Sequence, residues 1–329
     1  MTSLCPACHS NAISFSHNSL RHRLATVKCK MCGLRFIKER IDQHQQAGLY
    51  ADEATYRDFA EAERSVTAVP RRRLGWSSLL QKAIQPQNFV LQHGRRPRLL
   101  DIGCGVGDFL AVARDAGFEV HGVELSPGAA RLAEQYHQLD VRVGDFKSEN
   151  RYGYFEAITL IGVLEHVRDP SELMSHASRL LAPGGVLLMY TPVWGVYDRI
   201  SSGLARLTRG HWSRLIDRRI NTAHLQIFPQ GTLRRLVEAN GLEVKQSLTV
   251  CEYNLPVHHY LRSIGIESAP LRRLVARGVD MLIDTNLFFR NNQRVLIEKP
   301  YPVRPSGPGC GGSQAASPPF QDGDVSRAE

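Results

Sequence analysis

The sequence has no long apolar run. No stretch of the 329 residues approaches the roughly 20 consecutive apolar residues that a membrane-spanning helix needs. The first ten residues, MTSLCPACHS, also lack the basic start followed by an apolar segment that marks a secretory signal. We therefore expect a chain without a membrane span and with a cytoplasmic location.

Cysteine is scarce outside the N-terminal segment, since four of the seven cysteines lie within the first 32 residues. A reducing compartment keeps thiols free, so disulfides are not expected. The four form two C-x2-C pairs, CPAC and CKMC, separated by twenty residues, which is the spacing of a zinc ribbon. Four thiolates complete a closed tetrahedral shell. We therefore expect a structural Zn²⁺ held by Cys5, Cys8, Cys29 and Cys32.

Positive and negative charges are unevenly distributed along the chain. Residues 1–96 hold 15 lysines and arginines against 7 acidic residues, residues 97–191 hold 8 against 13, and residues 192–228 hold 6 against 2. Basic flanks around an acidic centre favour an anionic partner, such as RNA, a nucleotide-linked sugar or a phosphorylated glycan. An ordinary solvated surface is the alternative explanation.

Short apolar runs alternate with helical patterns from Arg98 onward, and the sequence has no internal repeat. This alternation is typical of a parallel sheet covered by helices, a doubly wound α/β fold. The predicted strands are 98–102, 118–125, 141–145, 155–164, 186–192, 242–250 and 293–300. The predicted helices are 108–117, 126–139, 169–185 and 229–241, the third ending at Pro183-Gly184-Gly185.

The segment LLDIGCGVGDF, residues 99–109, predicts a ligand site at the end of the first strand. Glycines at 103, 105 and 107 allow a tight turn and a close approach of the backbone, and the next helix directs free N–H groups to the same place. Their G-x-G-x-G order differs from the G-x-G-x-x-G of dinucleotide sites. Asp101 and Asp108 would repel a pyrophosphate but suit the cationic end of S-adenosylmethionine.

With these features the sequence resembles the class I S-adenosylmethionine-dependent methyltransferases over about residues 97–250. The resemblance includes GVEL at the end of the second strand, VGDF after the third, LIGVLEHV (160–167) and LLAPGGVLLMYTP (180–192), with QRVLIEKP as the final antiparallel strand. It implies a Rossmann-like, mostly parallel seven-stranded sheet. It also implies that Glu124 binds the ribose hydroxyls and that Asp145 contacts the adenine amino group.

Ten residues are therefore expected to contact S-adenosylmethionine. They are Asp101, Gly103, Cys104, Gly105, Gly107, Asp108, Glu124, Leu125, Asp145 and Phe146.

Two histidines are candidates for the acceptor side of the site. His166 follows the fourth strand, at the carboxyl edge of the sheet where such folds bind ligands, and a neutral imidazole suits a general base. In related small-molecule methyltransferases a pair made of an acidic residue and a histidine at this place faces the acceptor. In this sequence the pair is Glu165 and His166. His224 is the second candidate by the same resemblance. Ordering of the loop, or packing in the core, is the alternative role of each.

The predicted organisation has four parts. Residues 1–45 form the zinc ribbon, 46–96 a helical linker or cap, and 97–300 the methyltransferase domain, whose insertions at 193–228 and 251–290 would form a lid over the acceptor. Residues 301–329, rich in Pro, Gly and Ser, are expected to be disordered. The ribbon is expected to pack on the catalytic domain and to shape its acceptor pocket.

The function that this pattern favours is transfer of a methyl group by in-line displacement to a small molecule or to a sugar or glycan precursor. One alternative is an RNA methyltransferase that uses the ribbon and the basic insertion as a clamp, although the N/D-P-P-Y/F motif of base-amine methyltransferases is absent. Another is a non-catalytic protein that binds S-adenosylmethionine.

Overall fold

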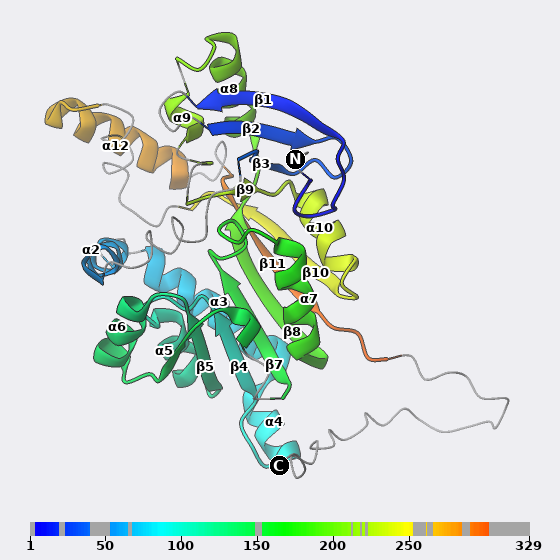
Figure 1. Ribbon diagram of the computed structural model, residues 1–329. Helices are drawn as coiled ribbons and strands as arrows, with labels where there is room; N and C mark the ends of the chain where they lie inside the picture. Colours follow the sequence, from blue (N-terminus) through cyan, green and yellow to red (C-terminus); the bar gives the residue numbers. More distant parts are fainter. Residues whose placement is uncertain are drawn as a thin grey trace, which may run out of the picture.

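The structure is a computed structural model, and it describes residues 4–19, 24–39, 53–64, 68–148, 153–211, 213–217, 219–220, 223–252, 261, 266–284 and 290–302. In this part of the chain a seven-stranded sheet forms the centre, and a smaller sheet built mainly from the N-terminal strands lies beyond one end of it (Figure 1). The C-terminal residues 303–329, predicted to be disordered, lie outside the described residues.

The central sheet has the strand order β10-β11-β8-β7-β4-β5-β6. Strands β4 to β8 pair in parallel, and β11 is antiparallel to both β8 and β10, so the predicted mostly parallel seven-stranded sheet is confirmed. The strands are β4 (Arg98–Ile102), β5 (Glu119–Glu124), β6 (Val141–Val143), β7 (Phe155–Ile161), β8 (Leu181–Pro192), β10 (Glu243–Val250) and β11 (Asn292–Glu298).

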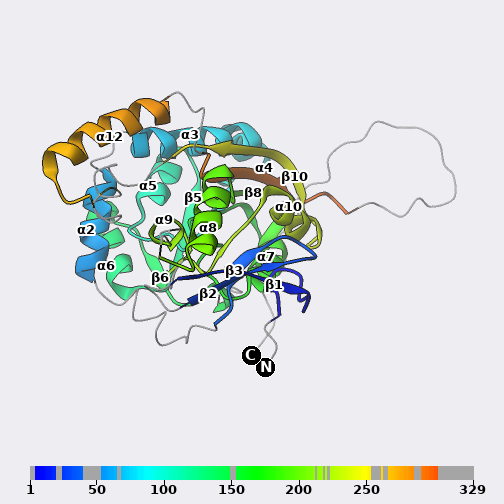
Figure 2. The same cartoon turned by 90° about the horizontal axis from the view of Figure 1, so that it is seen from above.

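Alternate residues of the central strands face two separate cores. Leu100 and Ile158 join the cluster that includes residues of helices α7 and α10, whereas their neighbours Leu99 and Ala157 join the cluster formed with α3, α5 and α6. A strand buried on both faces needs this nearly continuous apolar sequence. Figure 2 shows α3 and α5 on one side of the sheet and α7 and α10 on the other. The fold is therefore doubly wound.

The helices that cover the sheet are α3 (Ala68–Ile84), α5 (Asp108–Asp115), α6 (Pro127–His137), α7 (Pro170–Leu180) and α10 (Gln230–Glu238). Two of them have N-terminal side-chain caps: the Ser126 hydroxyl accepts from the N–H of Ala129, and the Asp169 carboxylate accepts from that of Glu172. The remaining helices are α2 (Glu53–Arg64), α4 (Pro86–His93), α8 (Val196–Leu207), α9 (Arg214–Asp217) and α12 (Ala269–Asp284), with a short 3₁₀ turn at Phe146–Ser148.

The third predicted helix ends earlier than expected, so the boundary at Pro183-Gly184-Gly185 was wrong. Helix α7 ends at Leu180, and Leu181 already has extended backbone and pairs with Phe155 of β7. Gly184 then donates its N–H to the carbonyl of Lys299, and the N–H of Lys299 donates to the carbonyl of Gly185. These pairs recruit residues 181–185 into β8, which begins five residues before the predicted strand.

The second sheet joins the N-terminal segment to residues far along the chain. Strands β1 (Ile13–Ser19), β2 (Leu24–Cys29) and β3 (Arg35–Ile37) form an antiparallel meander, and β3 also pairs with β9 (Gln226–Ile227). Figures 1 and 2 both place α8 beside β1, where Ser202 of α8 bonds the ring of the buried His17 at 3.1 Å. Val27, Cys29 and Phe36 of this sheet belong to the same core cluster as Leu100 and Leu173, whereas Ile37 and Ile227 belong to a separate cluster with Trp194.

None of the helices in the described ranges is both long enough and apolar enough to cross a membrane.

Candidate functional site

The candidate site lies where the strand order reverses. Strand β4 has β5 on one side and β7 on the other, so the loops after β4 and β7 leave the sheet next to each other at its carboxyl edge. Open α/β sheets bind their ligands at such a switch point. The glycine loop follows β4, and the turn that carries Glu165 and His166 follows β7.

The glycine loop has the backbone that the sequence predicts. Gly103, Gly105 and Gly107 have φ values of 72°, 56° and 77°, which a residue with a Cβ adopts only under strain. A Cβ on Gly103 would also lie 2.7 Å from a methyl carbon of Val163. The Val163 side chain therefore lies directly against Gly103, so the glycine loop and the turn after β7 pack on each other.

Asp101, one residue before the end of β4, is a buried carboxyl group. Its Oδ1 accepts a 2.6 Å hydrogen bond from the hydroxyl of Thr159 on β7. Burial raises the pKa of Asp101 to about 7, with the Thr159 bond opposing the shift and the charge of Glu124 adding to it. Asp101 therefore changes charge near neutral pH.

Glu124 connects the end of β5 to the glycine loop. One carboxylate oxygen accepts from the N–H of Gly105 and the other from the N–H of Ser126, both at 2.9 Å. Burial raises the pKa of Glu124, whereas these backbone bonds and the charge of His166 lower it. A buried carboxylate next to the loop agrees with a role in holding hydroxyl groups of a ligand.

The structure gives Asp108 partners that the sequence did not suggest. Its two oxygens bond Arg73 of α3 and His137 of α6, each at 2.7 Å, and Arg73 also bonds Glu63 of α2 at 2.7 Å. The residue therefore links four helices around the start of α5. No pattern in the sequence pairs these residues, because bonded partners lie up to 35 positions apart, on different helices.

The other residues expected at the cofactor lie around the same edge. Leu125 and Asp145 are exposed after β5 and β6, and Asp145 accepts from the N–H of Lys147. Phe146 packs edge-on against His176 of α7. The Cys104 thiol is buried against β5, where a Cβ on Gly122 would lie 2.9 Å from its sulfur. Burial raises the pKa of this thiol, so it behaves as a small apolar group.

The two predicted histidines come together with Glu165. The rings of His166 and His224 are 4.8 Å apart edge-to-face, and Nε2 of His166 lies 4.0 Å from Oε1 of Glu165. Donor atoms of all three side chains lie within 4.8 Å of one another. His166 donates its Nδ1–H to the carbonyl of Ala223 at 2.9 Å, so Nε2 carries the lone pair of the neutral ring.

The environment of His224 favours the uncharged form of its ring. Desolvation, together with the charges of His166 and Arg219, lowers the pKa of His224 to about 3. Desolvation raises the pKa of the buried Glu165, whose Oε2 accepts a 2.9 Å bond from the Thr191 hydroxyl. We refer to Glu165, His166 and His224 below as the acceptor trio.

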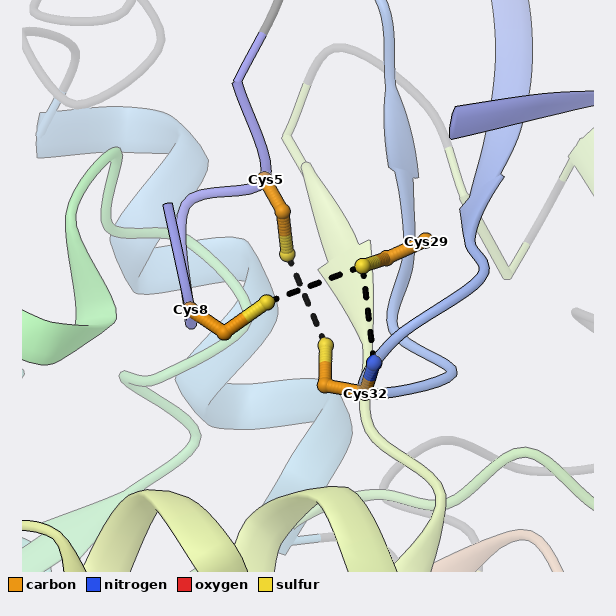
Figure 3. Close-up of side chains that lie close together, drawn as sticks. All are labelled: Cys5, Cys8, Cys29 and Cys32. Atoms are coloured by element: carbon orange, nitrogen blue, oxygen red, sulfur yellow. Dashed lines mark hydrogen bonds between the residues drawn. The ribbon is translucent and has the colours of Figure 1, made fainter. Parts of the chain in front are cut away.

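The four N-terminal cysteines point toward one another (Figure 3). Sulfur–sulfur distances are 3.5 Å for Cys5 and Cys32 and 3.6 Å for Cys8 and Cys29, and the Cys32 N–H is directed at the Cys29 sulfur. All four sulfurs lie within 4.8 Å of one another. A cluster of four thiol sulfurs from two knuckles fits a tetrahedral zinc ion in its donor type and its shape.

A short segment joins the cysteine sheet to the acceptor trio. Ile37 of β3 donates its N–H to Leu225, and Leu225 donates its own to the carbonyl of Glu165, at 2.9 and 2.8 Å. The Gln226 side chain donates to the carbonyls of Leu164 and Val167. His224 therefore comes directly before a short segment that bonds the ribbon through β3 and also bonds the turn after β7. Sequence reasoning missed β9 because two residues carry no periodic signal.

Two arginines of the basic segments have internal partners. Arg35 stacks on the buried Trp194, 3.9 Å from the ring centroid, and burial lowers its pKa to about 10. Arg219 bonds Asp198 at 2.8 Å and the carbonyls of Val193 and Asn291. The RNA alternative gains no support from these two side chains.

The chain was compared with known protein families and sequences. Residues 71–247, more than half of the chain, match the family described as a methyltransferase domain. Ubiquinone biosynthesis O-methyltransferases are similar over shorter stretches. That of Xanthomonas oryzae pv. oryzae is 35% identical over 101 residues, and that of Caulobacter sp. is 34% identical over 110. These alignments cover 29% and 30% of this chain and only 42% and 44% of the relatives.

Solved structures give weaker likenesses. Magnesium protoporphyrin IX methyltransferase from Synechocystis PCC 6803 aligns with a TM-score of 0.45 and 13% identity, over 79% of this chain and 89% of that one. Geranyl diphosphate C-methyltransferase from Streptomyces coelicolor A3(2) aligns with a TM-score of 0.42 and 18% identity, over 66% and 75%. Likenesses at these scores add nothing to the strand order as evidence of the fold.

The contact between Gly103 and Val163 gives a prediction about stability. Gly103→Ala places a Cβ both in left-handed backbone and against Val163, so it should destabilise the protein by more than the about 1–2 kcal/mol of backbone strain alone. Gly105→Ala, which meets no atom within 4 Å, measures that strain by itself. Urea unfolding should rank them in this order, and Val163→Ala should recover part of the loss in Gly103→Ala but none in Gly105→Ala. Equal losses that ignore Val163 would contradict the contact.

The raised pKa of Asp101 predicts a dependence of stability on pH. Between pH 4 and 7 the unfolded carboxyl group ionises while the folded one keeps its proton, so the free energy of unfolding falls as pH rises. Asp101→Asn has no proton to lose and keeps an oxygen for Thr159. Relative to this variant, the wild type should lose stability between pH 4 and 8, by an amount on the order of 4 kcal/mol. Parallel pH profiles from urea unfolding would refute the shift.

Proposed function

The chain belongs to the methyltransferase-domain family, and on this premise we propose that it transfers a methyl group from S-adenosylmethionine to a hydroxyl oxygen of a small molecule. One observation carries the proposal: the turn that holds Glu165 and His166 packs on the glycine loop through Val163 and Gly103. Oxygen as the acceptor atom is supported by the O-methyltransferase relatives. Sugars and glycan precursors are included in this class of acceptor.

We assign the donor side to the residues at the ends of β4, β5 and β6. The observed acceptor groups fit such a ligand: Glu124 offers carboxylate oxygens for ribose hydroxyls, and Asp101 offers a carboxyl group for a cationic end. Asp145 is assigned to the adenine amino group, and Leu125 and Phe146 to contacts with the ring. Asp108, whose two oxygens bond Arg73 and His137, is assigned to holding α5 in place instead of contacting the ligand.

Bound S-adenosylmethionine supplies a methyl group activated by its sulfonium, so the protein needs chiefly to align the acceptor and exclude water. The acceptor hydroxyl must also lose a proton. Nε2 of His166 carries the lone pair of a neutral ring whose Nδ1–H is fixed on Ala223. In this assignment His166 accepts the proton, and Glu165 and His224 hold its ring in place.

We assign a structural Zn²⁺ to the four N-terminal cysteines. The cluster leaves no open coordination position, so its ion would stabilise the ribbon and take no part in chemistry. Through β3 and β9 it would also fix the backbone of His224. The ribbon is therefore assigned to shaping the acceptor side of the site.

Labelled methyl transfer tests the proposed function. The full chain is incubated with methyl-labelled S-adenosylmethionine and a host extract, which is then separated into RNA, protein, glycan and small-molecule fractions. Label should appear in the small-molecule or glycan fraction. His166→Asn should slow this transfer about a hundredfold or more while leaving equilibrium binding of S-adenosylmethionine unchanged. His211→Asn, at an exposed histidine, is the matched control and should have no effect.

Other outcomes of the same experiment would contradict the proposal. Label in RNA or protein would show that the acceptor is a macromolecule and not a small molecule or a glycan precursor. Binding of S-adenosylmethionine without transfer to any fraction would leave a binding protein.

Zinc content gives a separate prediction. The purified chain should hold one Zn²⁺, which Cys32→Ser should lose together with a large part of its stability, because a structural zinc site contributes directly to folding. Cys251→Ser, at a half-buried thiol outside the cluster, should keep both. Metal analysis and thermal unfolding measure these changes. A chain that holds no zinc, or that retains it in Cys32→Ser, would exclude the assignment.

A further inference from the structure

Asp101 is a buried carboxyl group that lacks a balancing cation within the described part of the chain. The residue is 2% exposed, and the one hydrogen bond of its side chain to a described residue is the 2.6 Å bond that Oδ1 accepts from the Thr159 hydroxyl. No lysine, arginine or histidine in the described ranges forms an ion pair with it. Such a group keeps its proton, because ionisation would leave an unpaired charge where water cannot solvate it.

Asp108, at the start of α5, shows the opposite arrangement. Arg73 of α3 and His137 of α6 each bond it at 2.7 Å, and Arg73 also bonds Glu63 at 2.7 Å. These helices cover the face of β4 that Asp101 shares with Leu99. Their cations are therefore paired with other carboxylates, and Asp101 is left as the aspartate of the glycine loop whose charge a bound ligand can balance.

The other elements around Asp101 bring no cation to it among the described residues. Strand β7 contributes the hydroxyl of Thr159, and the glycine loop contributes the thiol of Cys104, which burial keeps neutral. Strand β5 contributes Glu124, a second buried carboxyl group, whose oxygens accept from two backbone N–H groups. The charge of His166, in the turn after β7, acts on Glu124. Two neighbouring buried carboxyl groups do not both ionise readily until a cation arrives.

We propose that the cationic end of S-adenosylmethionine takes the place of a proton on Asp101, so that binding of this cofactor releases the proton to water. The inference rests on the proposed function, which assigns Asp101 to that end. Because Oδ1 accepts from Thr159, the proton of the empty site is on Oδ2. On binding, this O–H bond breaks, the proton passes to water, and the carboxylate that remains pairs with the positive charge of the ligand.

The exchange makes Asp101 a residue that couples cofactor affinity to pH. One positive charge leaves as another enters, so the buried carboxylate forms only when its partner is present. Burial raises the pKa of Asp101 to about 7 in the empty site, aided by the charge of Glu124 and opposed by the Thr159 bond. Below that pH, a fall of one pH unit should weaken binding of the cofactor by up to about tenfold, because the proton competes with it.

Titration calorimetry of the full chain with S-adenosylmethionine at pH 6 counts the released protons directly. The binding enthalpy is measured in buffers that differ in ionisation enthalpy, because the buffer takes up each proton that binding releases. The amino group of the cofactor is fully charged at this pH, so the proton must come from the protein. The wild type should release about 0.9 proton per cofactor. Asp101→Asn should bind more weakly and release none.

One variant and one ligand serve as controls. His166→Asn should release as many protons as the wild type; it is needed because an imidazole is the other kind of group that loses a proton near pH 6. Methylthioadenosine, which lacks the charged amino-acid end and the sulfonium, should bind to the wild type without proton release. This ligand tests the exchange even if Asp101→Asn does not fold.

Three results would overturn the proposal. They are binding of S-adenosylmethionine without proton release, release that folded Asp101→Asn retains, and equal release with methylthioadenosine. Labelled methyl transfer by a chain that releases no proton would leave the proposed function standing. Proton-linked binding without any labelled product would instead refute the function alone.

Discussion

The candidate site depends on one backbone connection, the segment 223–227 held between two parts of the molecule. On one side Ile37 of the cysteine sheet donates to Leu225, and on the other Leu225 donates to the carbonyl of Glu165. Because the same short strand bonds both, the N-terminal sheet contributes directly to the position of His224. A knuckle carbonyl strengthens the connection: that of Cys32 accepts from Thr232 and Arg235 of α10.

The two halves of the site differ in how they are held. Buried carboxylates on adjacent strand ends form the donor side, where Asp101 bonds across to β7 and Glu124 closes the glycine loop. The acceptor side is built from a turn and a segment that are distant in sequence and joined through backbone carbonyls. The proposed function therefore assigns a part in the site both to the parallel core and to the N-terminal sheet.

The glycine loop of the proposed donor side and the cysteine cluster could both be predicted from the sequence, because each is encoded locally. The glycines at 103, 105 and 107 need left-handed backbone, and the two C-x2-C knuckles carry their spacing within a few residues. The long apolar strands likewise gave the doubly wound sheet. Pairing between distant residues could not be predicted: Asp108 with Arg73 and His137, or β3 with β9. The end of α7 was misplaced for the same reason, since Lys299 recruits residues 184–185 into a strand.

The central claim is that the N-terminal sheet and the turn after β7 form one rigid unit through residues 223–227. Hydrogen exchange of two amides in the native full chain, those of Ile37 and Leu225, tests it most directly, because they are the successive donors of the connection. As the denaturant concentration rises, both amides should exchange through openings that have the same free energy. If Ile37 exchanged through a low-energy opening while Leu225 stayed protected, the ribbon would be a separate appendage and the account would be wrong.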